Sequence, residues 1–123
     1  MTASKTSFPK TERIKQAADF RILFKQARMV RENGLALYFL KTPGPKKSRL
    51  GIVVSRRVLK NATDRNRVKR KIREFFRLHK ADFQSNFDLI ARVTDGSKLL
   101  EINNLDHILT RIFKRAGVLN HVG

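Results

Sequence analysis

The segment from Arg65 to Arg77, which reads RNRVKRKIREFFR, constrains the fold of this chain more than any other stretch. Its apolar residues recur at spacings of four, three and one, which gathers them into one stripe if the segment is helical. These residues are Val68, Ile72, Phe75 and Phe76. The stripe predicts an amphipathic helix that packs on a core through one face.

The opposite face of this predicted helix is strongly positive. At about 100° per residue, the side chains that fall opposite Phe75 are Asn66, Lys69, Arg70, Arg73 and Arg77. Arg65 and Arg67 stand in the first turn, where the positive end of the helix dipole repels them. A charge-rich helix face is often only solvated surface, but like charges four residues apart destabilise an isolated helix. We therefore expect a polyanion to bind this face.

The whole chain is basic. Its 123 residues include 28 Lys and Arg against 10 Asp and Glu, for a formal net charge of +18. Self-repulsion on this scale favours a polyanionic partner, with nucleic acid ahead of an anionic membrane. No apolar run approaches the length of a membrane-spanning helix, and the absence of cysteine excludes disulfides and thiol chemistry. A hydrophobic content of 41% indicates a folded core rather than a disordered polycation.

The remaining pattern predicts a single α+β domain with one sheet. We expect residues 1–15 to form a basic, poorly ordered arm, residues 16–117 the domain, and residues 118–123 a frayed tail. Helices are expected at Gln16 to Ala27, over the basic segment Arg65 to Arg77 with a cap at Asn61 or Thr63, and after a cap at Asn103 or Asn104. Strands are expected at Arg28 to Glu32, Leu35 to Thr42, Arg49 to Ser55 and Phe87 to Val93, with a hairpin turn at Asn33-Gly34. The predicted order is α-β-β-β-α-β-α, with all four strands in one sheet.

No set of side chains in the sequence has the pattern of a catalytic or metal site. His79, His107 and His121 are scattered and lack metal-ligand spacing. The carboxylates are dispersed, with no pair placed for general acid and base work. Ser55 lacks the glycine setting of a hydrolase nucleophile. We therefore predict no catalytic residue and no metal ligand, which argues against a self-contained nuclease.

Three aromatic residues allow two interpretations. Phe20 and Phe24 lie one helical turn apart, and Tyr38 lies in the middle of a predicted strand. Aromatic residues at such spacing usually belong to the core. Beside basic residues they can also form a stacking surface for unpaired bases. The residues alone favour the core.

The basic helix is one part of a longer pattern of motifs. Arg65-Asn66-Arg67 is followed by Lys69-Arg70 and Arg73, and the strand before it reads RLGIVVSRR. Further parts are the D-F-x-x-L-F helix from Asp19 to Phe24, the strand tyrosine Tyr38, and the run from Leu89 to Arg92. Together these motifs resemble the protein subunit of bacterial ribonuclease P, over roughly residues 10–116.

This resemblance implies a division of labour between the chain and an RNA. In the family, a catalytic RNA subunit cleaves precursor tRNA with Mg²⁺ held mainly by the RNA, and so removes the 5′ leader. The protein binds that RNA and the precursor tRNA in the cytoplasm, with no membrane and no further protein partner implied. We therefore expect contacts with the catalytic RNA from Arg56, Arg57, Arg65, Asn66, Arg67, Lys69, Arg70, Arg73 and Arg77. We also expect a leader-binding cleft lined by Phe20, Phe24, Tyr38 and Arg92. The resemblance thus assigns the three aromatic residues to this cleft, whereas the residues alone favoured the core.

The family fold also implies a left-handed βαβ crossover around the basic helix, against the general right-handed rule. The chain departs from the family at Val93-Thr94, where another basic residue or proline often stands. Leader contacts beyond Arg92 therefore lack support.

An alternative function remains open on the sequence. A structural RNA-binding protein of the ribosomal type, with no part in cleavage, would have the same charge and a similar fold. The R-N-R signature and the aromatic residues of the expected cleft favour the ribonuclease P subunit.

Overall fold

The computed structural model describes residues 8–99 and 102–120, without the side chains of residues 98 and 102–104. Its main elements occur in the order α-β-β-β-α-β-α, which confirms the predicted α+β fold. They are α1 (Ala17–Gln26), β1 (Arg28–Glu32), β2 (Leu35–Lys41), β3 (Arg49–Val53), α2 (Ala62–His79), β4 (Phe87–Val93) and α3 (Ile102–Arg115). Short 3-10 helices occupy Lys10–Glu12, Lys80–Asp82 and Gly96–Leu99. His121 and the predicted caps Asn103 and Asn104 lie outside the described side chains.

The four strands form one mixed sheet in the order β1-β2-β4-β3. β2 pairs antiparallel with β1 and with β4, whereas β3 and β4 are parallel. At the predicted hairpin turn, Asn33 and Gly34 have φ angles of 38° and 90°, the left-handed pair that a tight hairpin requires. α2 connects the parallel strands β3 and β4, and the left hand of that crossover stays a prediction.

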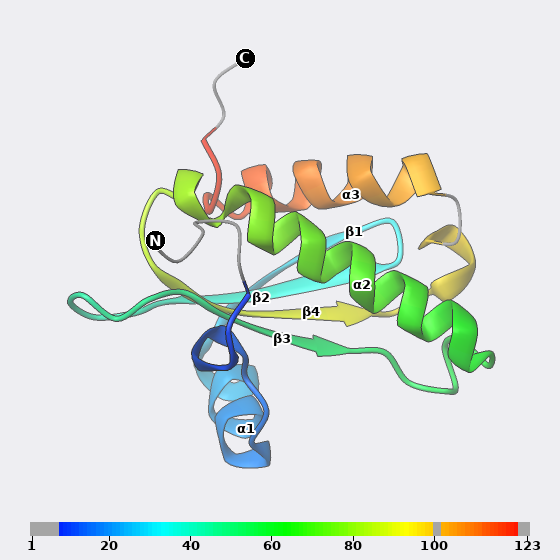
Figure 1. Ribbon diagram of the computed structural model, residues 1–123, viewed down its shortest axis with the longest axis horizontal. Coiled ribbons are helices and arrows are strands. Elements are labelled where there is room, and N and C mark those ends of the chain that lie inside the picture. Colours follow the sequence, from blue (N-terminus) through cyan, green and yellow to red (C-terminus); the bar gives the residue numbers. More distant parts are fainter. Residues whose placement is uncertain (1–7, 100–101, 121–123) are drawn as a thin grey trace.

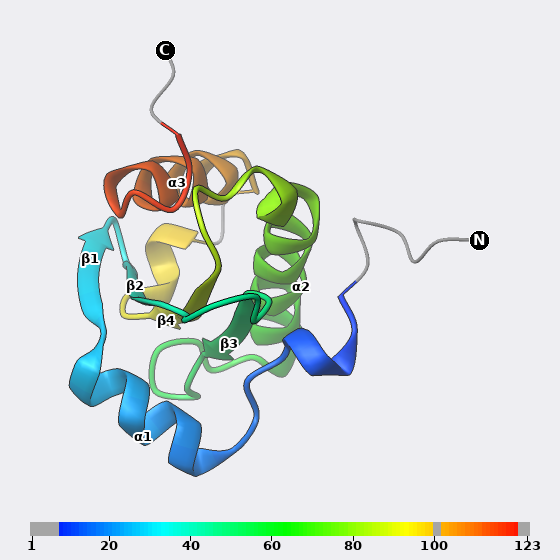
Figure 2. The ribbon, with the colours of Figure 1, turned by 90° about the vertical axis from the view of Figure 1, so that its left-hand side faces the viewer.

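Helices cover the two faces of the sheet unequally. α2 and α3 lie on one face, and α1 lies across part of the other (Figures 1 and 2). The apolar stripe of α2 is buried as predicted, with Val68, Ile72, Phe75 and Phe76 at most 6% exposed. It packs against a core that includes Leu37 of β2, within a cluster to which α3 also contributes.

α2 begins directly after Asn61, one of the two predicted cap residues. Asn61 occupies the N-cap position, but its side chain makes no hydrogen bond to the helix backbone. Instead its amide nitrogen donates to the Asp64 carboxylate over 3.3 Å. The helix ends at His79 and passes directly into a 3-10 turn.

Residues 8–15 pack on the domain where the sequence predicted a poorly ordered arm, and we call them the N-terminal strap. Glu12 is 5% exposed and forms an ion pair with Lys80. Ile14 is 4% exposed, and its N–H donates to the Leu50 carbonyl over 2.9 Å. The strap is therefore held by partners distant in sequence, which local periodicity does not reveal. Residues 1–7 of the predicted arm lie outside the described residues.

The segment after α3 also differs from the frayed tail predicted there. Gly117, with φ 79°, ends the helix as expected. The chain then turns back, so that the N–H of Val118 donates to the Phe113 carbonyl over 3.0 Å. This turn buries Val118 and Leu119 in the main core. Residues 121–123 lie outside the described residues.

Candidate nucleic-acid interface

The predicted cationic face of α2 lies on the surface. Asn66, Arg70 and Arg73 are exposed, and the other predicted side chains of the helix are half-buried: Arg65, Arg67, Lys69 and Arg77. Glu74 pairs with Arg77 over 3.9 Å. Within the described part of the chain, Arg67, Lys69, Arg70 and Arg73 form no ion pair. These positive charges are therefore available to an external anion.

Arg65 has a structural role that the sequence did not reveal. Its Nη1 donates to the carbonyl oxygens of Leu59 and Lys60, each over 2.8 Å. These bonds fix the loop between β3 and α2, which carries the exposed residues Arg56 and Arg57. Arg65 thus holds other cations of the predicted surface in place, and its own contact with RNA stays a prediction.

The second predicted surface lies on the opposite face of the sheet. Side chains alternate between the two faces of a strand, so Tyr38 of β2 points away from α2 and α3, since its neighbour Leu37 belongs to the main core. Tyr38 is paired with Ile90 of β4, and Ile90 with Gly51 of β3. α1 lies over these residues and buries Leu23 beside Ile90 in a second, smaller core.

All four residues of the predicted leader cleft gather at this face. The ring centroids of Phe24 and Tyr38 are 4.8 Å apart in an edge-to-face arrangement, and those of Phe20 and Phe24 are 6.3 Å apart. The Arg92 guanidinium lies 6.0 Å from the centroid of the Phe24 ring. Phe24 is 37% exposed, and Arg92 is exposed as well. An aromatic side chain thus lies open to solvent beside a cation.

Phe20 differs from Phe24 in its surroundings, because its ring lies directly on Gly51. A Cβ atom at Gly51 would come within 2.8 Å of two carbon atoms of the Phe20 ring and within 3.2 Å of Ile14. Gly51 therefore sets how closely α1 approaches the sheet. The sequence pattern gave Gly51 no such role, although a glycine inside a strand can mark a close approach.

An ion-pair network fixes the beginning of α1 against the sheet. The Arg49 guanidinium donates to both carboxylate oxygens of Asp88, each over 2.9 Å, and lies 3.6 Å from the carboxylate of Asp19 on α1. The hydrogen bond to Asp88 raises the pKa of Arg49 above its ordinary value, against the opposing effect of burial. A cation whose pKa is raised by folding stabilises the folded state fully at any pH below its ordinary pKa. This stabilisation is lost only as the pH rises through the raised pKa. The network therefore does not titrate near neutral pH through Arg49.

We expect Gly51→Ala to displace Phe20 and to lower the free energy of unfolding by about 1–3 kcal/mol, because the new methyl group overpacks this contact. Urea unfolding measures the effect. Combining Gly51→Ala with Phe20→Leu removes ring atoms from the clash, so the double variant should lose about 0.5–3 kcal/mol less than the sum of the two single losses. Additive losses would show that the Gly51 contact does not position α1.

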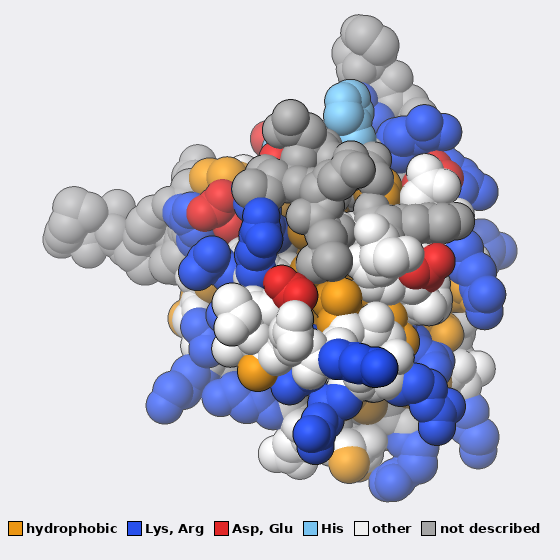
Figure 3. All heavy atoms as spheres, turned by 90° about the vertical axis from the view of Figure 1, so that its right-hand side faces the viewer, with side chains coloured by type: hydrophobic (Ala, Val, Ile, Leu, Met, Phe, Trp, Pro, Cys, Tyr) orange, Lys and Arg blue, Asp and Glu red, His pale blue; other side chains and the backbone are white. Residues whose placement is uncertain are grey.

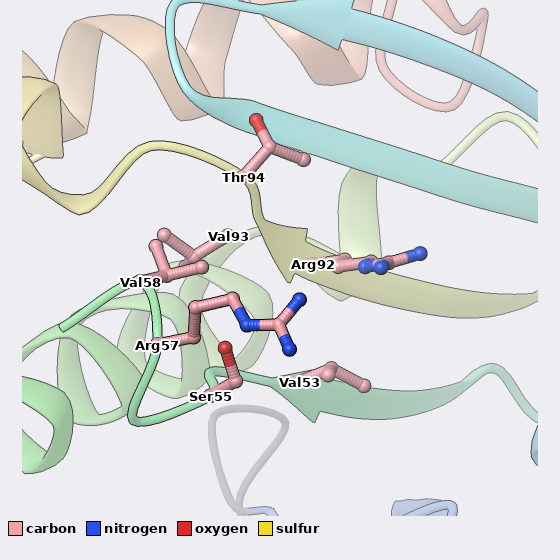
Figure 4. A pocket seen from close by; sticks show the side chains of 7 residues that line it. All are labelled: Val53, Ser55, Arg57, Val58, Arg92, Val93 and Thr94. Carbon is pink, nitrogen blue, oxygen red and sulfur yellow. The ribbon is translucent and has the colours of Figure 1, made fainter.

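A pocket lies between the two predicted surfaces, at the C-terminal ends of β3 and β4. Its volume is about 510 Å³, and its lining includes Ser55, Arg57, Arg92 and Thr94. Figure 4 shows the Arg57 side chain extending from the loop after β3 toward the strand that carries Arg92. Figure 3 shows this end of the molecule, where Lys and Arg side chains gather over the lower half and the right edge. A cation expected to bind the catalytic RNA therefore shares a pocket with one expected to bind the leader.

The residues that the structure describes contain no group of three or more His, Cys, Asp or Glu side chains that could hold a metal ion. None of the helices described is both long and apolar enough to cross a membrane.

Comparison with known proteins gives a consistent result. A family model described as Ribonuclease P matches residues 8–117. The "Ribonuclease P protein component" of Dictyoglomus turgidum is 35% identical, with 91% of this chain and 94% of that protein covered. That of Staphylococcus carnosus is 38% identical, with coverages of 81% and 89%.

Solved structures show the same similarity. The Staphylococcus aureus RNase P protein superposes with a TM-score of 0.77 at 32% identity, covering 89% of this chain and 98% of that one. The RNase P protein from Thermotoga maritima gives a TM-score of 0.72 at 30% identity, with coverages of 85% and 96%. The similarity thus extends over nearly the whole of the fold described above.

Proposed function

This chain belongs to the bacterial ribonuclease P protein family, and we propose that it meets its two RNA partners through surfaces that join at one pocket. It is the protein subunit of a ribonucleoprotein endoribonuclease in tRNA processing. Its partners are the catalytic RNA subunit and precursor tRNA. The alternative of a ribosomal-type structural protein is set aside, because relatives matched over nine-tenths of this chain are ribonuclease P components.

The surface for the catalytic RNA consists of the α2 cations and the loop that Arg65 holds. Lys69, Arg70 and Arg73 carry positive charges that no acidic group in the described residues neutralises. Phosphate groups would supply that neutralisation, and the released counterions would make binding strongly dependent on salt. Arg56 and Arg57 extend this surface toward the ends of β3 and β4.

The surface for the 5′ leader begins at the aromatic residues where α1 meets the sheet. The observation that carries this assignment is the open Phe24 ring, which packs edge-to-face on Tyr38 and lies beside Arg92. An unpaired base can stack on such a ring while a neighbouring cation contacts its phosphate. From Phe24 the leader would continue past Arg92 to the pocket shared with Arg57. This path brings the leader next to the catalytic RNA on α2.

We further propose that hydrolysis takes place on the RNA subunit in the cytoplasm. Hard cations such as Mg²⁺ prefer several oxygen ligands, and the described residues offer no carboxylate cluster of that kind. The Mg²⁺ ions are therefore assigned mainly to the RNA. The protein contributes the positioning of the leader and of the catalytic RNA.

Single-turnover cleavage of a leader-bearing precursor tRNA at low Mg²⁺ tests this function. The catalytic RNA is assayed alone, with the protein added, and the protein is assayed by itself. We expect the protein to restore cleavage at the mature 5′ end and to be inactive without the RNA. Binding to the RNA with no effect on the cleavage rate or on the Mg²⁺ requirement would contradict the proposal.

A further inference from the structure

We propose that a groove between the N-terminal strap and α2 binds one unpaired nucleotide of the RNA subunit, a site that rests on the proposed function. The groove has a volume of about 180 Å³ and is floored by Leu50 and Ile52 of β3. Figure 2 shows the strap, in dark blue, beside β3 and near α2. We call this site the strap groove.

The rim of the strap groove is cationic on both sides. Arg13 and Lys15 come from the strap, and Lys69 and Arg73 come from α2. The strap contains one acidic residue, Glu12, which is 5% exposed and paired with Lys80. Among the described residues, no carboxylate lines the groove or pairs with its four cations. The rim therefore suits a phosphate group.

The floor suits a base rather than a second phosphate. Apolar side chains of Leu50 and Ile52 form it, with the Phe8 ring beside them. The volume lies below the roughly 300–1,000 Å³ typical of pockets for larger ligands, which favours one flat group over an extended chain. The cationic rim and the apolar floor together match the two parts of one nucleotide, a phosphate and a base face.

The edge of β3 supplies polar groups at the same place. β3 is an edge strand, and the carbonyl of Leu50 accepts a hydrogen bond from the N–H of Ile14 across that edge. Backbone groups two residues apart on a strand point to the same edge, so those of Ile52 also point outward, one step beyond the isolated bridge between Arg13 and Leu50. A base lying in the groove can pair its polar edge with them.

The groove is already assembled in the folded protein. The ring centroids of Phe8 and Phe76 are 5.3 Å apart, which anchors the beginning of the strap on α2. The Arg13 guanidinium lies 4.7 Å from the Phe8 ring centroid and donates to the Phe8 carbonyl over 3.0 Å. A pre-ordered cation costs little conformational entropy on binding.

The position of the groove identifies its occupant as part of the RNA subunit. Leu50 and Ile52 point to the α2 side of the sheet, whereas Gly51 and Val53 point to the side of Phe24. The strap groove and the leader surface thus lie on opposite faces of β3. The groove is continuous with Lys69 and Arg73, which belong to the surface proposed for the catalytic RNA.

Filling the groove tests the proposal without changing the charge. We expect Ile52→Trp to weaken binding to the catalytic RNA about tenfold, the effect of losing one base contact, with an unchanged dependence on salt. Ile22→Trp, at a position 51% exposed on α1, is the matched control and should bind like the wild type. Equal binding by both variants would overturn the proposal.

A second pair of variants keeps the test independent of packing at Ile52. Lys15→Glu and Lys47→Glu change the net charge equally, and both positions are exposed, but only Lys15 lines the groove. Lys15→Glu should lower affinity more and reduce the salt slope by about 1 relative to Lys47→Glu.

Arg70→Ala separates the hypothesis of the strap groove from the hypothesis that α2 binds the catalytic RNA. If it weakens binding while the groove variants match their controls, only the groove is wrong, and if none has an effect, the proposed function fails as well.

Crosslinking identifies the occupant directly. Because the chain has no cysteine, Lys15→Cys provides a single attachment point for a short photo-crosslinker in the full complex, with Lys47→Cys as the control. We expect Lys15→Cys to label one unpaired nucleotide of the RNA subunit that the control does not label. Labelling of the leader, of paired helices, or of the same nucleotides as the control would overturn the assignment.

Discussion

The double variant Arg70→Glu/Arg73→Glu is expected to bind the catalytic RNA roughly 100-fold more weakly than the wild type at physiological salt. Both side chains are exposed, and neither forms an ion pair within the described residues. Each reversal removes a phosphate contact and adds a repulsion, so the slope of log affinity against log salt should fall by about 2. Binding measured across a salt series checks both values.

The matched control reverses two charges elsewhere. Lys46 and Lys47 are exposed in the loop between β2 and β3, so Lys46→Glu/Lys47→Glu alters the net charge equally. We expect this control to have a much smaller effect on affinity. Equal weakening by the two double variants would mean that the RNA responds to net charge alone and that α2 is not the binding surface. Urea unfolding should show changes within about 0.5 kcal/mol for both, since exposed positions are involved.

Phe24→Ala is expected to reduce the affinity of the holoenzyme for leader-bearing precursor tRNA about tenfold and to leave mature tRNA unaffected, because stacking of one base on an aromatic ring contributes roughly 1–3 kcal/mol. The structure favours Phe24 over Phe20 for this test. Phe24 is 37% exposed, so its removal leaves little cavity. Binding of the two tRNA forms by the holoenzyme is the measurement.

Ile22→Ala is the control for Phe24, because Ile22 belongs to the same helix and is 51% exposed. It should affect neither form of tRNA. Phe20→Ala carries two effects, since the Phe20 ring also lies on Gly51 and packs against the small core that contains Ile14. An equal loss of affinity for leader-bearing and mature tRNA in the Phe24 variant would place the Phe24 side chain outside the leader path.

Periodicity predicted the regular elements well where burial alone determines them. β4 has the bounds predicted from its apolar run, Phe87–Val93, and the stripe of α2 is buried as expected. The strap was missed because its order depends on Leu50 and Lys80, which are remote in sequence. No local pattern in residues 8–15 encodes those contacts.

The sequence likewise predicted one part of the candidate site and missed another. The cationic face of α2 follows from helical spacing alone, whereas residue types favoured a core role for Phe24 and Tyr38. Their gathering depends on how α1 lies across the sheet, which Gly51 and the Arg49 network determine. The pocket shared by Arg57 and Arg92 follows from the parallel pairing of β3 and β4, which sequence spacing does not specify.

The central place of β4 in the sheet has a consequence for the order in which the chain can fold during its synthesis. β2 and β3 follow one another in sequence but do not touch, because β4 lies between them. Until Phe87–Val93 leaves the ribosome, β3 has no strand partner and the apolar stripe of α2 has no completed sheet to cover. Domains fold as units once their non-local pairings can form. The cationic helix therefore leaves the ribosome before the sheet that positions it is complete, and we expect both proposed RNA-binding surfaces to form together when β4 is inserted.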